Sequence, residues 1–551
     1  MNKNIKILTG LAICSFLFST ITSCIDETEP TSGLTQEQVD ASDNAISSML
    51  MAMPARFNQF DARTGNFGDY AFGYGGIMHI RDVQTEDMAI PESNYDHFYP
   101  WEVNKGMGES TARTQYLWNF NWQSILAANK LIKAIPDEEN ASTFDLAAKG
   151  AAYAFRALYY IDMARCFEFL PNDIYSGKNQ DGNDVTNLTI PIVDENSTEE
   201  SVKNNPRATR EQMFEFIKQD LDNAERLIVN LDKFTDYKRG KDYTLPHIDA
   251  VYGLKARLYM WVEDYQNALT YAQKAIQNAT EASLTTFDDC FELVQEGESA
   301  YLVPTKTCFN TISKWMWGVA QTSENRTVTS GIMNWTSWMT PECTFGYANA
   351  GCPPCIYLPL LARTDADDWR YYFWDEEDPA APGVSQKFQP NQGEFKNSKV
   401  AAATPYPIMR LEEMYFIVAE AMAQLQPAQG KAFLIQFMQK YRSVNANLLG
   451  KTATYTCNAT SKEDIIEEII FQKRIELWGE GQSFFDIKRL NYSVDRTQPG
   501  SNFQSLARLK TKGRPAWMNW VIVQTEQNNN KGLVGWNNPD PTDKYNVVPE
   551  D

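Results

Sequence analysis

The sequence predicts a mainly α-helical protein, a scaffold of tetratricopeptide-like helical pairs with a long, loop-rich insertion that carries short strands. Apolar residues recur every three or four positions through most of residues 41–280 and 405–490. Residues 281–404 lose this period and are rich in Pro, Gly, Thr, Cys and aromatic residues. Residues 249–276 are predicted to form two helices joined by a tight turn, with alanines where the second packs on its partner, as in a tetratricopeptide repeat.

Individual helices have recognisable starts and stops. The segment 209–231 begins with Thr209 and Gln212, which have the spacing of a capping box. Apolar residues then follow along one face of that helix: Phe214, Ile217, Leu221, Ala224 and Ile228. The same period, together with Pro or Gly near several of the ends, predicts further helices over 111–135, 145–170, 411–425, 429–444 and 461–481.

The N-terminus has the pattern of a bacterial lipoprotein signal. Lys3 and Lys6 precede an apolar run that is too short to span a bilayer, and small residues then lead to Cys24. A lipid on Cys24 would anchor the chain without a transmembrane helix. The predicted division of the chain is a signal peptide (1–23), a lipidated flexible tether (24–40) and a single domain (41–551) that ends in an irregular segment (491–551).

The chain is strongly acidic, with 50 basic and 71 acidic residues and a net charge of −21. Loss of residues 1–23 removes two lysines and no acid, so the mature charge is 48 − 71 = −23. Such a charge argues against nucleic acid and against anionic membrane surfaces as partners. The sequence has no later apolar run of about 18 residues, so we expect membrane attachment through the lipid alone.

Two stretches of the scaffold carry a family resemblance: MRLEEMYFIVAEA (409–421) and IIFQKRIELWGEGQSFFDIKRL (469–490). Their Arg-x-x-Glu, Ala-Glu-Ala, Glu-Gly and Asp-x-x-Arg elements resemble the SusD/RagB family of Bacteroidetes outer-membrane lipoproteins. The resemblance covers nearly the whole chain, from the N-terminal cysteine motif onward. One departure is Ser483, where the family usually has an arginine.

The resemblance implies a SusD-like fold and a role in nutrient uptake. Such proteins bind nutrient oligomers, typically glycans, and cover a SusC-like TonB-dependent transporter. Asp26, Glu27 and Glu29 also resemble the acidic signal that sends these lipoproteins to the outer face of the outer membrane. We therefore expect a lipid-anchored surface protein that binds oligosaccharides or polysaccharides and delivers them to such a transporter. Capture of peptides by the same architecture is the alternative.

The charged residues of these motifs could form either an active site or structural ion pairs. Their helical spacing favours ion pairs between helices, because buried charges persist only when they are paired. The residues expected to pair are Arg410, Glu413, Glu420, Arg474, Glu476, Glu480, Asp486 and Arg489.

Catalytic motifs are scarce, so we expect a binding protein and not an enzyme. His79, His97 and His247 lie far apart and lack ligand spacing, and GYGG at 73–76 is expected to be a loop. A glycoside hydrolase would need two carboxylates that face each other across a cleft, which adjacent acids do not supply. We expect no cofactor; a calcium ion at TDADDW (364–369) stays open, although this segment lacks the glycine and terminal glutamate of an EF-hand.

Cys352 and Cys355 in GCPPC have the spacing of a redox or metal pair. The sequence offers no second such pair and no histidine pair to complete a zinc site. We favour a local disulfide or an inert pair over a thiol oxidoreductase, with Cys343 as a further candidate partner.

Aromatic residues in the irregular segments are the candidate ligand contacts. Aromatic rings stack on the flat faces of sugars, while amides, carboxylates and backbone groups bind the hydroxyls at the rim. Residues 315–338 mix four tryptophans with such polar groups, and residues 66–104 offer a second aromatic set. Burial in the core is the competing interpretation for each ring. The predicted ligand-binding residues are Tyr74, Asp82, Trp101, Asn104, Trp315, Trp317, Trp335 and Trp338.

Overall fold

The structure is a computed structural model. The predicted signal peptide and tether, with Cys24, lie outside the described residues. The structure describes residues 45–59, 69–90, 97–228, 243–297, 299–305, 309, 314–320, 353–364, 367–376, 381–390, 394, 396–397, 400, 403–443 and 455–549.

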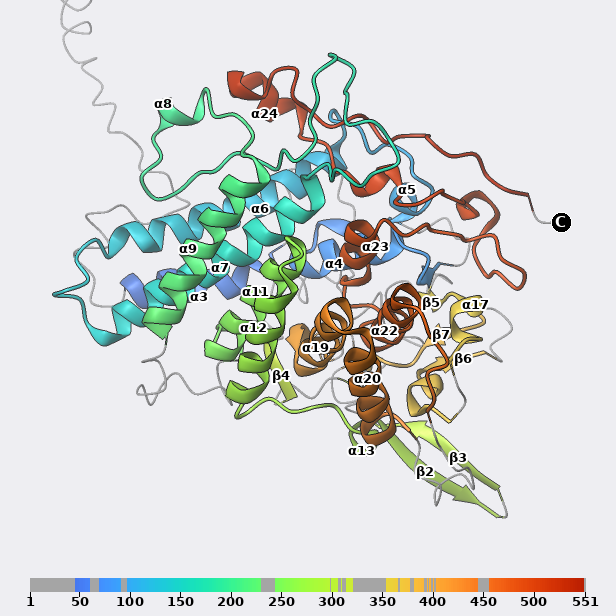
Figure 1. The fold of residues 1–551 in the computed structure, drawn as a ribbon. Coiled ribbons are helices and arrows are strands. Elements are labelled where there is room, and N and C mark those ends of the chain that lie inside the picture. Colours follow the sequence, from blue (N-terminus) through green and yellow to red (C-terminus); the bar gives the residue numbers. More distant parts are fainter. Residues whose placement is uncertain are drawn as a thin grey trace, which may run out of the picture. The chain divides into compact units, whose positions relative to one another are not determined.

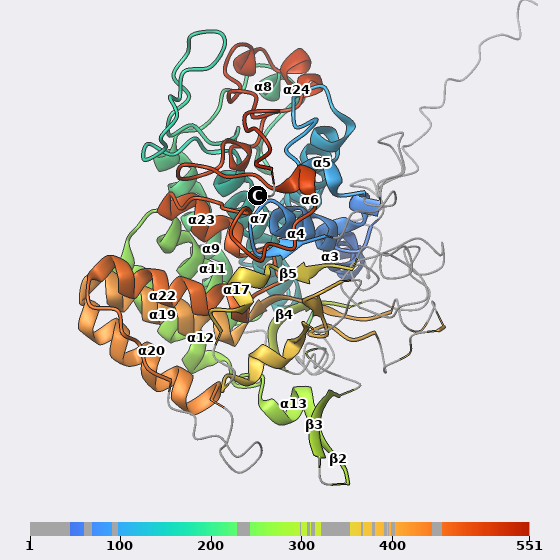
Figure 2. The ribbon, with the colours of Figure 1, turned by 90° about the vertical axis from the view of Figure 1, so that its right-hand side faces the viewer.

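Long helices make up the scaffold, which confirms the predicted fold class (Figure 1). They are α6 (Ala112–Ala134), α7 (Thr143–Phe167), α9 (Arg210–Ile228), α11 (Ile248–Trp261), α12 (Tyr265–Asn278), α19 (Leu411–Leu425), α20 (Pro427–Tyr441), α22 (Lys462–Glu476) and α23 (Ser483–Leu490). Among these long helices, each one from α6 to α19 packs on the next one named, and α22 packs on both α19 and α20. Figure 2 shows α12, α19, α20 and α22 side by side.

The helices α11 and α12 form the predicted tetratricopeptide-like pair. Glu263 makes the tight turn with a left-handed φ of 62°. The carboxylate of Asp264 then caps α12 by accepting a hydrogen bond from the backbone N–H of Asn267 at 3.1 Å. Small alanines on the buried face of α12 let the neighbouring helices approach closely: Ala268, Ala272 and Ala275.

Two helices begin where the sequence did not predict them, one at a proline and one at a glycine. The helix expected from residue 429 begins at Pro427, because proline is well tolerated in the first turn. The prediction that GYGG is a loop is wrong, since Gly73 begins the buried helix α4 (Gly73–Val83). Gly73 has a φ of +66°, and a Cβ there would lie 1.9 Å from the carbonyl oxygen of Phe57. The chain can therefore enter this helix only with glycine.

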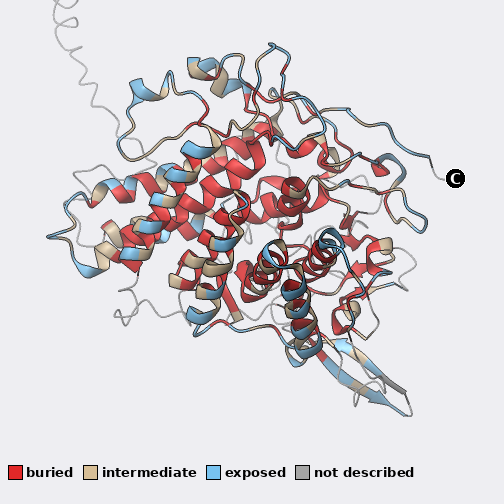
Figure 3. Ribbon diagram, in the orientation of Figure 1, coloured by how far each residue is buried: buried red, intermediate tan, exposed pale blue. Residues whose placement is uncertain are grey.

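The strands are short, as expected for the insertion. β1 (Met88–Ala89), β5 (Cys355–Ile356), β7 (Val384–Ser385) and β6 (Trp374–Asp375) form one antiparallel sheet in that order. β4 (Trp315–Val319) pairs with β8 (Tyr406–Arg410), and β2 (Phe291–Glu296) pairs with β3 (Ser299–Pro304). Figure 1 shows the β2–β3 hairpin projecting below the helices, and Figure 3 shows it largely exposed.

Shorter elements complete the fold around a core centred on the scaffold. Helix α7 is buried along most of its length, as Figure 3 shows. Among the described residues, none of the helices is both long and apolar enough to cross a membrane. The remaining helices are α3 (Ala45–Arg56), α5 (Tyr99–Glu102), α8 (Glu199–Val202), α13 (Phe287–Cys290), α17 (Leu358–Leu361), α24 (Gln524–Asn529) and the 3-10 helices η2 (Asp69–Ala71), η5 (Trp369–Phe373), η7 (Ser505–Ala507), η8 (Ala516–Met518) and η9 (Lys531–Leu533).

Candidate functional site

The small four-stranded sheet joins the region around residues 66–104 to the insertion. Ala89 pairs with Cys355 across β1 and β5, and Cys355 pairs with Val384 across β5 and β7. Asp375 on β6 pairs with the same Val384. Strand β1 belongs to the region around residues 66–104, and the other three strands belong to the insertion. The sheet therefore ties the insertion to this region, and its residues are buried except for the half-buried Asp375.

Four predicted ligand residues from the first region lie in the core. The Tyr74 hydroxyl donates to Asp162 Oδ2 at 2.6 Å. Asp82 accepts the backbone N–H of Gly481 at 3.0 Å, and burial raises the pKa of its carboxyl well above the ordinary value. The ring of Trp101 packs edge-on against Tyr70, and Asn104 Nδ2 donates to the carbonyl oxygen of Pro541 at 2.9 Å. The prediction of ligand contact is corrected for Tyr74, Asp82, Trp101 and Asn104, because their side chains are buried and engaged with protein.

Trp315 and Trp317 are also core residues. Their exposed fractions are 1% and 0%, because β4 is paired with β8 and packs against α11. Trp317 Nε1 donates to the carbonyl oxygen of Thr244 at 2.9 Å, and its ring lies edge-on to Phe155 with 5.1 Å between centroids. A ring enclosed in this way has no face for a sugar, so the predicted ligand contact is corrected for both tryptophans.

The remaining candidates lie outside the described residues. Trp335 and Trp338 therefore stay predictions, and so does a disulfide involving Cys343 or Cys352. Cys355 is described and is buried in β5, where its Sγ lies 3.4 Å from the carbonyl oxygen of Pro353.

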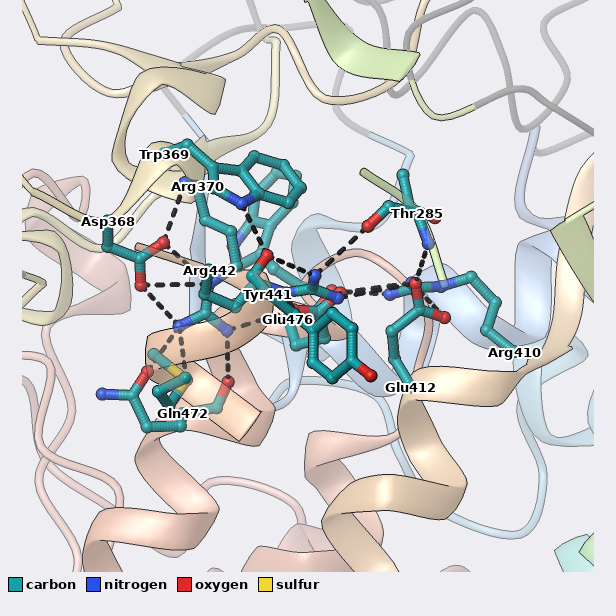
Figure 4. Close-up of polar contacts among 12 residues, drawn as sticks. Thr285, Asp368, Trp369, Arg370, Arg410, Glu412, Tyr441, Arg442, Gln472 and Glu476 are labelled. Atoms are coloured by element: carbon teal, nitrogen blue, oxygen red, sulfur yellow. Dashed lines mark hydrogen bonds and ion pairs between the residues drawn. The ribbon is translucent and has the colours of Figure 1, made fainter. Parts of the chain in front are cut away.

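A buried network of charges lies where the insertion meets the scaffold helices (Figure 4). Arg410, the last residue of β8, places Nη2 2.8 Å from Glu480 Oε1 and Nη1 3.2 Å from Glu476 Oε1. Its Nη1 also lies 2.9 Å from Glu412 Oε2. Glu412 lies in the first turn of α19, Glu476 is the last residue of α22, and Glu480 follows it. This one guanidinium therefore holds β8 to the start of α19 and to the end of α22.

Glu476 is the centre of the network. Arg442 Nε lies 2.7 Å from its Oε2, and Arg370 Nη1 lies 3.1 Å from the same oxygen. Burial raises the pKa of the Glu476 carboxyl, but the guanidinium groups of Arg442, Arg410 and Arg370 outweigh burial and hold this pKa well below the ordinary value. Glu476 is therefore a permanent anion and is unsuited to proton transfer near neutral pH.

The insertion is fixed to the scaffold through the same network. Arg370, in η5, is bound by Asp368 with 2.6 Å between Nη2 and Oδ2. Lys387 Nζ lies 2.8 Å from Glu480 Oε1 and donates to the carbonyl oxygens of Glu476 and Trp478, each at 2.8 Å. The sequence interpretation missed Lys387, because a single lysine in an irregular segment carries no periodic signal.

The other motif charges are paired in the core as well. Glu413 accepts both Nε and Nη2 of Arg257, at 2.7 and 2.6 Å. The remaining pairs join Arg489 to Glu420 and Asp486, Lys473 to Asp486, and Arg474 to Glu86 and Asp87. Each of these motif carboxylates has a cationic partner, so the arrangement holds helices together and offers no free acid or base to a substrate.

Comparison with known proteins now identifies the fold. A family model described as the SusD family matches residues 366–550, and one described as "Starch-binding associating with outer membrane" matches residues 43–260. The chain belongs to the SusD family. The resemblance seen in the sequence is thereby confirmed, and the second description supports association of this SusD-family member with the outer membrane.

Individual relatives cover most of the SusD-family chain. A SusD-like protein of Formosa agariphila is 21% identical over 94% of this chain and 96% of its own. A SusD-like carbohydrate binding protein from Bacteroides vulgatus has a TM-score of 0.68 at 19% identity, covering 90% of this chain and 97% of that one. Surface glycan-binding protein A from Bacteroides thetaiotaomicron, solved in complex with laminarihexaose, has a TM-score of 0.60 at 15% identity, covering 89% and 98%.

Proposed function

We propose that this SusD-family protein is a lipid-anchored lipoprotein on the cell surface. It binds oligosaccharides or polysaccharides and delivers them to a SusC-like TonB-dependent transporter. The observation that carries the proposal is the match of residues 43–260 to a family described as starch-binding and associated with the outer membrane. The shared fold with a glycan-binding protein that was solved with laminarihexaose supports the same class of ligand. The lipoprotein pattern that ends at Cys24 supports the anchor.

We propose binding without catalysis and without a cofactor or calcium ion. The charged motifs that could suggest an active site are buried ion pairs between structural elements. Within the described ranges, three or more His, Cys, Asp or Glu side chains do not gather where they could hold a metal ion. Binding then depends on shape, ring stacking and hydrogen bonds alone.

The test is calorimetric titration of the full chain in detergent with plant, host-mucin and microbial glycans and with a peptide digest. We expect saturable binding of at least one glycan, no release of new reducing ends, and the same affinity after treatment with a chelator. Binding of peptides alone would replace the proposal by peptide capture. Release of sugar products would overturn the non-catalytic role.

Trp335→Ala and Trp338→Ala test the two aromatic candidates that stay predictions. We expect at least one of them to weaken glycan binding by about tenfold, the effect of losing a buried aromatic anchor. The matched control is Trp536→Ala, because this indole is 39% exposed and belongs to the C-terminal segment, outside residues 281–404. Delivery is tested by comparing uptake of the bound glycan in cells with and without the SusC-like partner.

A further inference from the structure

A groove on the scaffold has a lining that contains no residue of the four-stranded sheet. We call the α6 residues of its lining the floor, and the lining residues of α24 and its end and of 191–205, which include the end of α8, the walls. Figure 1 shows α8 and α24 above α6. Its volume is about 370 Å³, which falls in the range of about 300–1,000 Å³ that is usual for small-molecule sites. The groove is therefore large enough for a short segment of an oligomeric ligand.

An apolar strip runs along the floor of the groove. Trp118, Trp122 and Leu126 follow one another at intervals of four residues on α6, so they lie on one face of the helix. The two indole rings have centroids 5.5 Å apart and planes inclined by 51°. Trp122 is half-buried, and Leu126 is 51% exposed. Solvent thus reaches an aromatic and aliphatic surface that a helix would ordinarily cover or replace with charge.

Amide side chains border this strip. Asparagine and glutamine supply seven of the sixteen residues that line the groove. Gln115 Nε2 donates to Asn119 Oδ1 at 2.8 Å, and the Thr525 hydroxyl on α24 donates to Gln115 Oε1 at 2.6 Å. Trp122 Nε1 is buried and, among the described residues, has no hydrogen-bond acceptor. Amides combine donors and acceptors, so the rim can bind hydroxyl groups in either direction.

The lining carries almost no charge. Glu526 is the one charged residue among those described around the groove, whereas 22% of the chain is charged. Its Oε2 already accepts a hydrogen bond from Trp118 Nε1 at 3.4 Å. The described lining therefore offers no cationic side chain to a carboxylate or sulfate group, and burying such a charge is unfavourable. The nearby Arg56 and Arg156 already donate hydrogen bonds to the lining residues Gln123 and Asn129.

The walls are held in place without a ligand. Asn530 Oδ1 accepts the backbone N–H of Asn205 at 2.8 Å, and Asn530 Nδ2 donates to the carbonyl oxygen of Asn205 at 2.7 Å. This reciprocal pair joins the segment after α24 to the segment after α8. A groove that is already formed loses less conformational entropy on binding.

We propose that this groove is a second binding site and takes a short segment of a neutral oligosaccharide. The half-buried indole of Trp122 and the exposed Leu126 would contact the C–H face of a sugar ring, while the amides bind its hydroxyls. The inference rests on the proposed function for the class of ligand, but it assigns a site of its own. The groove selects neutral sugars over uronic or sulfated sugars.

Fluorine NMR of the full chain labelled with 5-fluorotryptophan reads this site directly. The chain has 14 tryptophans, and Trp122→Phe identifies the signal of Trp122 by its loss. We expect laminarihexaose or maltohexaose to shift that signal in a saturable way, and hexagalacturonic acid to leave it unchanged. A shift with the anionic sugar alone, or with a peptide digest alone, would overturn the assignment to a neutral glycan.

Affinities of groove variants separate this inference from the proposed function. Trp122→Ala and Leu126→Glu should each weaken the groove site by at least about tenfold, while Trp536→Ala should not. Leu126→Glu is the safer variant, because an exposed side chain contributes little to folding. If laminarihexaose binds but neither groove variant changes its affinity or the Trp122 signal, the groove inference fails and the proposed function stands. If no glycan in the full panel binds, both fail.

Discussion

Glu476 and Arg442 form a buried ion pair, with 2.7 Å between Oε2 and Nε. The pair joins the last residue of α22 to the residue that follows α20. Because Arg370 in the insertion binds the same carboxylate, the contact ties the insertion to the scaffold. The base of the insertion is thus fixed to the scaffold by buried charges.

Replacement of this carboxylate should strongly destabilise the protein. Glu476→Gln leaves the buried guanidinium groups without their shared anion, so we expect a loss of about 3–5 kcal/mol in the free energy of unfolding. Urea denaturation measures it. The control is Lys218→Ala, which breaks an exposed pair with Asp222 and should change stability by about 1 kcal/mol or less. Similar losses in the two variants would contradict the central role of Glu476.

The buried His79 should make stability depend on pH. Burial lowers its pKa to about 3, whereas an unfolded histidine has a pKa of about 6.5. Between these values the unfolded state binds the proton and the folded state does not. The contribution of His79 to the free energy of unfolding is therefore complete above about pH 6.5. It falls as the pH drops, by up to about 1.4 kcal/mol per pH unit.

His79→Gln removes this titration. The difference in unfolding free energy between wild type and variant should change with that slope between pH 6 and pH 4.5. NMR of the His79 ring in the wild-type protein checks the cause directly, because its signals should not titrate above pH 4. An ordinary titration near pH 6.5 would refute the prediction.

The core role of Trp317 predicts a loss of stability without a specific loss of binding. Trp317→Ala removes a fully buried ring from between β4 and α7, and we expect a cost of about 3–5 kcal/mol. Glycan titration well below the melting temperature of the variant should give the wild-type affinity. A large loss of affinity in folded Trp317→Ala protein would restore this residue as a ligand contact.

Gly430 sets the distance between α19 and α20. A Cβ at this position would lie 2.4 Å from the backbone nitrogen of Ala423. Gly430→Ala should therefore destabilise the protein by about 1–3 kcal/mol through overpacking. At an exposed position inside a helix, Gly→Ala raises the free energy of unfolding by up to about 1 kcal/mol. The sign of the change at Gly430 therefore distinguishes close packing from an exposed position. Chemical denaturation of the variant decides it.

The lipid anchor is tested at its predicted attachment residue. Cys24→Ala should prevent lipidation, because the thiol that would carry the lipid is gone. We expect the variant to leave the detergent phase in a phase-partitioning experiment, while wild-type protein stays in it. Unchanged partitioning would refute the anchor.

Much of the helical scaffold could be predicted, because its signals are local. The segment 411–425 was predicted with the bounds that α19 has, and the capping box predicted at Thr209 and Gln212 is present at the start of α9. The motif charges were expected to pair, and they are paired in the structure. What could not be predicted was the partner, since Arg257 lies 156 residues from Glu413.

The aromatic candidates show where the sequence becomes insufficient. Trp317 looked available because its segment has no helical or alternating period, yet β8 pairs with it from about 90 residues away and buries it. Trp122 was not predicted to bind ligand, because it lies in a regular helix. In the structure its ring is half-buried and lines a groove together with residues of α24.

The sequence by itself determined the helical scaffold, the lipoprotein pattern and the acidic charge, because periodicity, caps and composition act over a few neighbouring residues. Only the tertiary structure decided which aromatic rings are core and which face solvent. Burial depends on what packs over a side chain, and those partners come from segments far away along the chain.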